Sequence, residues 1–180
     1  MNKKYVMVGG LAFSEEKDMD KLKKYAKEGW MLEGIAFGLF YKFKKDEPKD
    51  IDYNLDYQSE ADEEYFSLFL DAGWMRVVSI GNEMHIFSAP EGTKPIYSDK
   101  ETEVDKYTRI KKKMGKGAIY SLIAMVTFAF VLEGATAILR PIFIAILILF
   151  FVTMFSFVFN FMPYVAYTYR LRKIGKNNIK

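Results

Sequence analysis

His85 is the only histidine in this sequence, and histidine is the residue type most often used for general acid–base catalysis. The sequence has no second histidine and no cysteine that could complete a zinc site or act as a nucleophile. Ser14, Ser59 and Ser98 are placed as helix caps and have no base nearby. A lone histidine in a predicted strand is typically structural. We therefore expect a protein that is not an enzyme and that has no catalytic residues, cofactor or metal.

Three aspartates form the only other grouping suited to a metal. Asp50, Asp52 and Asp56 could supply carboxylate oxygens to a hard cation such as calcium. They alternate with large apolar residues, which is the pattern of a strand with one face in water. Lys42 and Lys44, on a neighbouring predicted strand, would then lie opposite them. We favour this structural interpretation and keep the cation site as the alternative.

Two segments near the C-terminus have the composition of membrane-spanning helices. No charged residue occurs in the segment 141–162, and a helix of that length spans about 33 Å, against a hydrocarbon core of about 30 Å. A second apolar segment, 117–132, would continue past Glu133 to the outer interface. We expect Glu133 to lie at that interface near Arg140, with an intramembrane ion or partner contact as the alternative. We expect Asn160 to form an interhelical hydrogen bond.

Basic residues flank both predicted spans and indicate their orientation. The flanking basic residues are Lys111, Lys112, Lys113 and Lys116 before the first span and Arg170, Arg172 and Lys173 after the second. The positive-inside rule then places both termini in the cytoplasm, with the basic residues close to the anionic lipids of the inner leaflet. A net charge of +3 is too small to indicate a nucleic-acid partner.

The first 95 residues have the patterns of an α+β domain. Two helical patterns end at Gly29-Trp30 and at Gly73-Trp74, and a predicted hairpin follows each of them. A shift of 44 positions superimposes these elements, which indicates a weak internal repeat. The expected strands cover 5–13, 30–37, 39–44, 51–57, 75–80 and 84–88. These elements predict an antiparallel sheet with two helices on one face, close to a ferredoxin-like layout, before a linker helix and a two-helix transmembrane hairpin.

The predicted organisation has five parts. A cytoplasmic α+β domain covers residues 1–95, and a linker or juxtamembrane helix covers 96–116. The transmembrane helices cover 117–139 and 141–163, and a basic cytoplasmic tail covers 164–180. The N-terminal residues lack the long apolar stretch of a signal peptide, so we expect a two-span protein of the cell membrane.

The predicted sheet is unusually aromatic, which leaves two interpretations of its surface. We expect most of the aromatic side chains to pack against the two helices. Alternatively, one face of the sheet docks a peptide or a partner protein. The candidate partner-binding residues are Trp30, Phe37, Tyr41, Trp74 and Phe87.

Short motifs carry a resemblance to a known family. Glu-Gly-Trp occurs at 28–30, Ala-Gly-Trp at 72–74, Pro-Ile-Tyr-Ser-Asp at 95–99 and Tyr-Thr-Arg-Ile at 107–110. Over residues 5–110 the sequence resembles a family of uncharacterised bacterial proteins, common in Firmicutes, that is classed as a domain of unknown function. The resemblance implies a cytoplasmic domain before hydrophobic C-terminal segments and a gene often located beside PadR-type regulators. It implies no catalytic residues and suggests a membrane-linked envelope or stress response.

Two functional hypotheses follow. The first is a membrane-anchored cytoplasmic sensor or binding domain, non-enzymatic and regulatory, that holds a protein or a small ligand. The alternative is a small membrane accessory or immunity-type protein that acts through its transmembrane hairpin. Either would have a membrane or cytoplasmic protein partner in addition to the lipid bilayer. An enzyme is the least favoured class because the sequence lacks clustered acid–base groups.

Overall fold

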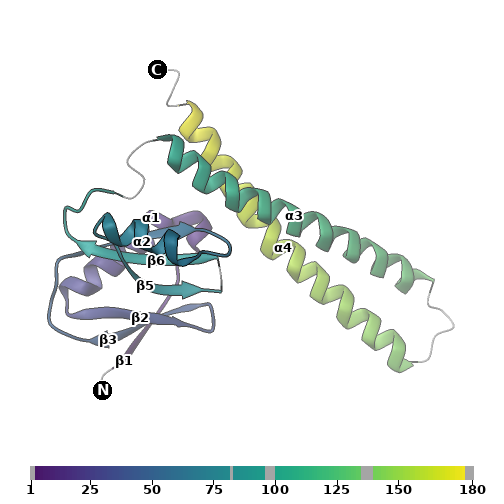
Figure 1. Cartoon of the computed structure of the whole chain (residues 1–180). Coiled ribbons are helices and arrows are strands. Elements are labelled where there is room, and N and C mark those ends of the chain that lie inside the picture. The colour runs from purple at the N-terminus through teal and green to yellow at the C-terminus, as the bar shows by residue number, and fades with distance from the viewer. Residues whose placement is uncertain (1–2, 82, 96–99, 135–139, 177–180) are drawn as a thin grey trace. The chain divides into compact units, whose positions relative to one another are not determined.

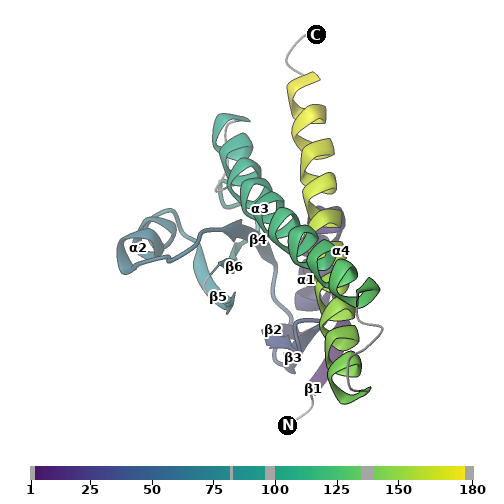
Figure 2. The same ribbon diagram turned by 90° about the vertical axis from the view of Figure 1, so that its right-hand side faces the viewer.

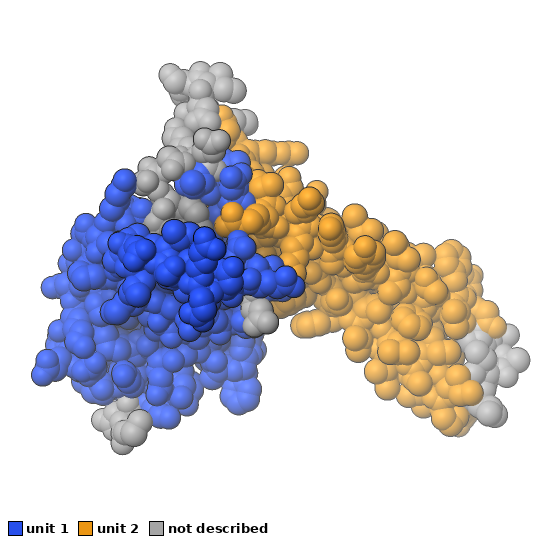
Figure 3. All heavy atoms as spheres, in the orientation of Figure 1, with its two compact units in different colours: residues 1–106 blue, residues 107–180 orange. Residues whose placement is uncertain are grey.

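The computed structural model describes residues 3–81, 83–95, 100–134 and 140–176, and Figure 1 shows the order of the elements. The chain divides into two compact units, residues 1–106 (unit 1) and residues 107–180 (unit 2), which Figure 3 draws in blue and orange. Parts of the predicted linker (96–99) and of the first predicted span (135–139) lie outside the described residues.

Unit 1 is built from strands and helices in the predicted order. Its described strands are β1 (Lys3–Met7), β2 (Trp30–Ala36), β3 (Phe40–Lys45), β4 (Ile51–Tyr57), β5 (Met75–Ile80) and β6 (Met84–Pro90). Its described helices are α1 (Leu11–Lys27), α2 (Glu63–Asp71) and the first residues of α3 (Lys100–Glu133). The order strand, helix, strand, strand therefore occurs twice. The predicted α+β class with two helix–Gly-Trp–hairpin units is confirmed.

The strands form two antiparallel three-stranded sheets of the same design. Their strand orders are β1-β3-β2 and β4-β6-β5, so the last strand of each hairpin is central and pairs with the other two. The hairpin registers also agree at an offset of 44 residues: Leu32 lies opposite Phe43, and Arg76 lies opposite Phe87. Directly after this pair, each hairpin has a one-residue irregularity. Equivalent positions in the two sheets can therefore be compared residue by residue.

The first strand is shorter than predicted. β1 ends at Met7 and α1 begins at Leu11, inside the segment 5–13 that was expected to be a strand. Gly10 has a left-handed backbone with φ of 85°, which glycine adopts at little cost and which turns the chain into the helix. Ser14 is not the N-cap that its position predicts. It lies at a kink inside α1 with φ of −133°, and its hydroxyl donates to carbonyl groups of the preceding turn.

Both complete helices of unit 1 end in a glycine followed by tryptophan, as the pattern predicts. Gly29 and Gly73 have φ of 76° and 86°, the left-handed conformation of a helix C-terminus. Trp74 is 3% exposed, and its indole N–H donates to the carbonyl oxygen of Lys94 at 3.0 Å. Trp30 is half-buried and lies beneath two lysine ammonium groups.

The core of unit 1 has two parts, one on each face of the β4-β6-β5 sheet. In the first, α1 packs against β2 and β4, and Leu22, Phe43 and Leu55 are fully buried. In the second, α2 packs against β5. The buried residues of this second part are Phe69, Trp74, Phe87 and Ala89. Figure 2 shows α2 on one side of this sheet and β2 and β3 on the other.

Lys106, near the start of α3, is buried in unit 1 together with its charge. Its side chain is 3% exposed, and its Nζ donates to Oε1 of Glu15 at 2.5 Å and to the carbonyl oxygen of Leu55. The second carboxylate oxygen of Glu15 is buried and has no hydrogen-bond partner among the described residues. A buried charge is tolerated only where partners compensate for its lost hydration. The ion pair therefore holds the first turns of α3 against α1 and β4.

Unit 2 consists of the remainder of α3 and of α4 (Arg140–Lys176). Both helices are long and apolar enough to cross a membrane. α3 is one continuous helix through residues 116 and 117, the predicted boundary between the juxtamembrane helix and the first span. α4 continues through Pro163 into the basic segment that was predicted as the tail.

Small residues of α3 allow a close approach of α4 within unit 2. The side-chain amide of Asn160 lies where a Cβ atom on Gly117 would be, and Ala118 and Ser121 are buried in the next turn. The Nδ2 of Asn160 donates to the carbonyl oxygen of Ser156 in its own helix at 2.7 Å. Among the described residues, Asn160 therefore contributes steric fit and a bond within α4, and not the interhelical hydrogen bond that was predicted.

Replacing Lys106 by methionine should lower the free energy of unfolding of unit 1 by about 3–5 kcal/mol, because Glu15 then stays buried without its counter-ion. The double variant E15L/K106M buries no charge and should recover most of the loss. Both tryptophans lie in unit 1, so tryptophan fluorescence during urea unfolding of the full chain in detergent measures this quantity. A loss below about 1 kcal/mol for K106M, as for a surface pair, would contradict the buried ion pair.

Candidate functional site

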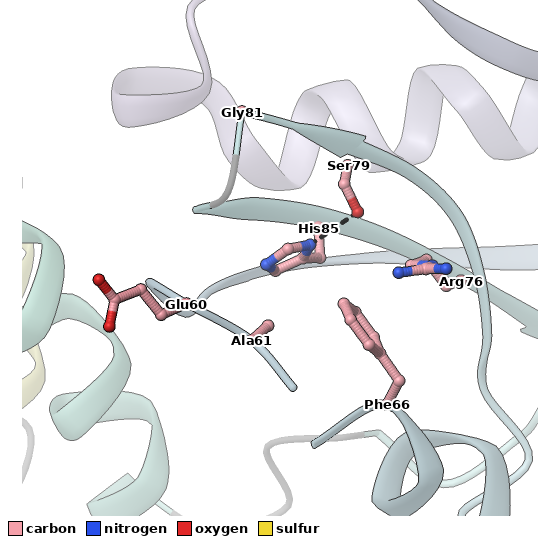
Figure 4. A pocket seen from close by; sticks show the side chains of 7 residues that line it. All are labelled: Glu60, Ala61, Phe66, Arg76, Ser79, Gly81 and His85. Carbon is pink, nitrogen blue, oxygen red and sulfur yellow. Dashed lines mark hydrogen bonds between the residues drawn. The ribbon is translucent and has the colours of Figure 1, made fainter. Parts of the chain in front are cut away.

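A cavity of about 220 Å³ opens beside the end of the β5–β6 hairpin in unit 1. Its lining residues are Glu60, Ala61, Phe66, Arg76, Ser79, Gly81 and His85. The β5–β6 hairpin supplies Arg76, Ser79, Gly81 and His85, α2 supplies Phe66, and the loop before α2 supplies Glu60 and Ala61. Figure 4 shows the side chains of Arg76, Ser79, His85 and Phe66 converging on the same side of the hairpin.

The cavity exists because α2 is shorter than α1. α1 has 17 residues and α2 has 9, and at the offset of 44 residues α2 begins at the position of Met19. Tyr41 of the first sheet and His85 of the second occupy equivalent positions. The first turns of α1 bring two carboxylates close to Tyr41, and α2 has no such turns above His85. The loop 58–62 replaces them and leaves this end of the sheet partly uncovered.

His85 is fixed by hydrogen bonds at both ring nitrogens. Its Nε2 lies 3.0 Å from the carbonyl oxygen of Gln58, which can only accept, so Nε2 carries a proton. In the neutral ring, Nδ1 then accepts a hydrogen bond from the hydroxyl of Ser79, whose Oγ is 2.8 Å away. His85 is 2% exposed, so it forms the back wall of the cavity and controls the direction of the Ser79 hydroxyl.

A serine hydroxyl that donates to an imidazole is also the arrangement of a nucleophile beside a general base. In serine hydrolases, however, a carboxylate orients the far ring nitrogen and several N–H donors hold the oxyanion. The far nitrogen of His85 instead binds a backbone carbonyl. Among the described lining residues, Arg76 is the one cation. This geometry favours binding of an anion over acyl transfer.

Arg76 presents an uncompensated charge to the cavity. Its guanidinium lies over the ring of Phe66, 4.1 Å from the centroid, which is a cation–π contact. No described carboxylate lies within salt-bridge distance of it. Glu60 lines the cavity as well, but Figure 4 shows its carboxylate pointing away from Arg76 and His85. The Glu60 carboxylate therefore does not neutralise the charge that Arg76 presents.

A buried carboxylate lies next to His85 in the sheet. Asp56 of β4 pairs with His85 and is 1% exposed, so the water-facing strand surface predicted for it is wrong. Its two oxygens accept from the N–H of Tyr57 and from the hydroxyl of Tyr65, both at 2.7 Å. Because Tyr65 belongs to α2, this bond fixes the start of that helix beside the cavity.

The other two aspartates of the predicted cluster pair with lysines of α1. Lys23 lies 2.7 Å from Asp52 and Lys27 lies 3.1 Å from Asp50, and both lysines also contact Glu91. Hydrogen bonds that its ammonium group donates to Asp52 and Glu91 raise the pKa of Lys23. The β3 lysines expected to face these aspartates belong to the other sheet. Within the described chain, no three carboxylates or imidazoles are placed to hold a metal.

The segment that contains the cavity matches a known family. A family profile described as "Protein of unknown function (DUF2812)" matches residues 14–119, more than half of the chain. The chain belongs to the DUF2812 family. The match includes both hairpins, α2 and every residue that lines the cavity, and it ends within α3. No curated protein and no solved structure matches the chain significantly.

The five aromatic residues predicted to bind a partner do not share one surface in this DUF2812 domain. Tyr41 and Phe87 are fully buried and Trp74 nearly so, which places all three in the core. Burial and the neighbouring carboxylates of α1 raise the pKa of the Tyr41 phenol. Trp30 is half-buried beneath lysines, whereas Phe37 is 93% exposed.

The basic residues predicted to set the topology lie on α3 and α4. The exposed members of the set are Lys112, Lys113, Lys116, Arg172 and Lys173. Lys111 lies over the ring of Tyr164 at 5.9 Å, and Arg170 lies over Tyr107 at 4.5 Å. Within unit 2 of the DUF2812 protein, two of these cations therefore pack on aromatic rings of the neighbouring helix.

The sequence patterns do not single out Arg76 or Ser79 as a member of a site. The hairpin predicted over 75–80 and 84–88 already places position 79 opposite His85, and that pairing could have identified Ser79. Arg76 had no such signal. Its position matters only because α2 begins late and leaves this end of the sheet open.

Replacing Tyr65 by phenylalanine should lower the free energy of unfolding of unit 1 by about 1.5–3 kcal/mol, since the buried Asp56 carboxylate loses a hydroxyl donor. The matched control is Y25F, because Tyr25 of α1 has no hydroxyl hydrogen bond among the described residues. Urea unfolding of the full chain, followed by tryptophan fluorescence, compares the two variants. Equal midpoints for Y65F and Y25F would show that the Tyr65–Asp56 bond contributes nothing.

Proposed function

We propose that this DUF2812 protein is a membrane-anchored, non-enzymatic binding protein that takes a small anionic ligand into the cavity at Arg76. The observation that supports this most directly is the Arg76 guanidinium, which lines the cavity without an ion pair to any described carboxylate. A ligand carboxylate or phosphate would supply the counter-charge and match the two parallel N–H donors of the guanidinium.

The Ser79–His85 pair can serve the same class of ligand through the Ser79 hydroxyl. When His85 is neutral, the Ser79 hydroxyl donates to Nδ1 and offers a ligand only oxygen lone pairs. When His85 is protonated, its Nδ1–H donates to Ser79, whose hydroxyl is then free to donate to an anion.

The size of the cavity limits the ligand. Pockets that enclose drug-sized molecules have volumes of about 300–1,000 Å³, and this cavity has about 220 Å³. A small metabolite with one carboxylate or phosphate group fits such a volume, whereas a folded protein segment does not. Phe66 adds one apolar wall beside the charged end, so the ligand would carry a short apolar or aromatic part.

The two spans of unit 2 support anchoring in a membrane, and the basic residues on either side support cytoplasmic termini. In that orientation the cavity is open to the cytoplasm, and the domain would act as a sensor or regulatory module. The envelope or stress role suggested by the family resemblance agrees with it. The matching registers of the two hairpins also support an origin of unit 1 by internal duplication.

The runner-up is an accessory protein that acts through its hairpin, with unit 1 in a secondary role. The close α3–α4 packing at Gly117 and Asn160 supports a preformed hairpin that could bind another membrane protein. Co-purification in mild detergent discriminates the two functions. A membrane protein that follows the full chain, and equally its R76A variant, would favour the hairpin.

Replacing Arg76 by alanine should weaken anion binding by at least about tenfold, because the ligand loses a charged hydrogen-bond partner. The measurement is isothermal titration of the full chain in detergent with inorganic phosphate and with short carboxylates.

The control for R76A is K24A, which removes an exposed cation on α1 away from the cavity. K24A should bind as the unchanged protein does. The absence of saturable binding for every probe, or equal binding by R76A, would remove the anion-binding proposal.

The proposed orientation has a direct test because the chain has no cysteine. Single substitutions S59C in unit 1, G134C between the spans and G175C near the end of α4 each add one thiol. In intact cells, a membrane-impermeant maleimide should label G134C alone, since the positive-inside rule keeps the basic segments inside. S59C and G175C should react only after the membrane is permeabilised. Labelling of G175C but not of G134C in intact cells would reverse the topology.

A further inference from the structure

The β1-β3-β2 sheet carries a cluster of exposed apolar residues at the end where β2 turns into β3. Its members are Met7 at the end of β1 and Phe37, Leu39 and Phe40 at the β2–β3 turn. Their exposures are 65% for Met7, 93% for Phe37, 56% for Leu39 and 37% for Phe40. The N–H of Val8 donates to the carbonyl oxygen of Leu39 at 2.9 Å, so the end of β1 and the turn lie side by side. The cluster is therefore contiguous (the apolar tip).

The backbone of the apolar tip is strained at Phe37, whose phenyl ring is exposed. Phe37 has φ of 53°, a left-handed conformation that costs a bulky residue of the order of 1 kcal/mol or more. The equivalent position of the second hairpin holds Gly81, which adopts φ of 59° without that cost. Because Phe37 is almost fully exposed, contacts within the protein do not offset the strain. A contact outside the protein would explain why a phenylalanine occupies this turn.

Basic side chains lie behind the apolar tip on the same face of the sheet. Lys3 pairs with Lys44 and Tyr5 pairs with Lys42, so these four side chains share the face that is turned away from α1. Lys42 forms an ion pair with Glu33 at 2.8 Å, and its hydrogen bond lowers the pKa of that carboxyl group. Lys3 and Lys44 have no such ion pair among the described residues. The face thus combines an apolar tip, an exposed tyrosine and net positive charge.

We propose that this face docks on the anionic leaflet of the bilayer, with the apolar tip inserted among the lipids and the lysines at the headgroups. Apolar and aromatic residues at a protruding turn, with a basic band behind them, have the distribution of an interfacial membrane anchor. The chain itself supplies the bilayer, because the two spans of unit 2 hold unit 1 at a high local concentration of lipid. At this local concentration, a docking contact that is weak by itself is sufficient to hold the face on the bilayer. The docked face differs from the cavity, so docking does not require the proposed ligand.

Depth-dependent quenching on the full chain in vesicles tests this proposal. A single L39C substitution carries an environment-sensitive nitrobenzoxadiazole dye, and the vesicles contain phosphatidylcholine with or without phosphatidylglycerol. The dye should shift to the blue and be quenched by nitroxide lipids when phosphatidylglycerol is present. Docking should weaken in about 1 M salt, where the Debye length is about 3 Å. The matched control is L68C on α2, an exposed apolar position at 63% that should stay in water.

Two further variants identify the contacts. In the L39C background, F37S should lower the ratio of docked to undocked protein by at least about tenfold, since a buried phenyl ring is lost from the lipid. K3E/K44E should abolish the dependence on phosphatidylglycerol. Unchanged tryptophan fluorescence unfolding confirms that each variant is folded.

Three outcomes would overturn the proposal. They are the absence of lipid quenching at L39C, quenching that F37S leaves unchanged, and stronger quenching at L68C than at L39C. A blue shift that depends on protein concentration in detergent and is insensitive to nitroxide lipids would also overturn it. That result would assign the face to contact between copies of the chain.

Discussion

The burial of the Lys106 ammonium group is the constraint on which the arrangement of unit 1 depends. An ammonium group that is 3% exposed must be given a counter-charge and an acceptor, and unit 1 supplies them from two different elements, Glu15 of α1 and the carbonyl of Leu55 in β4. Glu15 is available there only because α1 begins early, directly after the glycine turn. The extra turns of α1 thus serve the ion pair, and their absence from α2 leaves the cavity.

The two sheets show how one strand register can serve different purposes. Phe43 and Phe87 are equivalent and fully buried, so the centre of each hairpin is a core position. Around that centre the chemistry differs: Leu32, Ile35 and Tyr41 of the first hairpin correspond to Arg76, Ser79 and His85 of the second. Arg76, Ser79 and His85 are tolerated because loop 58–62 leaves them next to the cavity. The equivalent residues of the first hairpin are covered by α1. Helix length, more than strand sequence, decides which hairpin borders a cavity.

Sequence patterns were most informative where local chemistry determines the structure. The left-handed glycines before Trp30 and Trp74, the hairpins and the apolar spans were all predicted, since each depends on a few neighbouring residues. Predictions failed where distant segments meet. The alternation around Asp56 indicates a water-facing strand, yet α2 covers that face and Tyr65 satisfies the carboxylate. The role of Arg76 depends likewise on the late start of α2, which has no local signature.

The cavity and the buried ion pair are connected through two consecutive residues of β4. Asp56 pairs with His85 at the back of the cavity, and the carbonyl of Leu55 accepts from Lys106 of α3. A ligand that moves this part of β4 must also move the Leu55 carbonyl, which accepts a hydrogen bond from the buried Lys106 ammonium group. A buried ammonium group cannot lose such a partner without a large cost in free energy. Proximity alone does not establish coupling; a ligand affects α3 only as far as it binds two states of β4 unequally. Thermodynamic linkage is reciprocal: if a ligand changes the equilibrium between two positions of α3 by some factor, the position of α3 changes the ligand affinity of the cavity by the same factor.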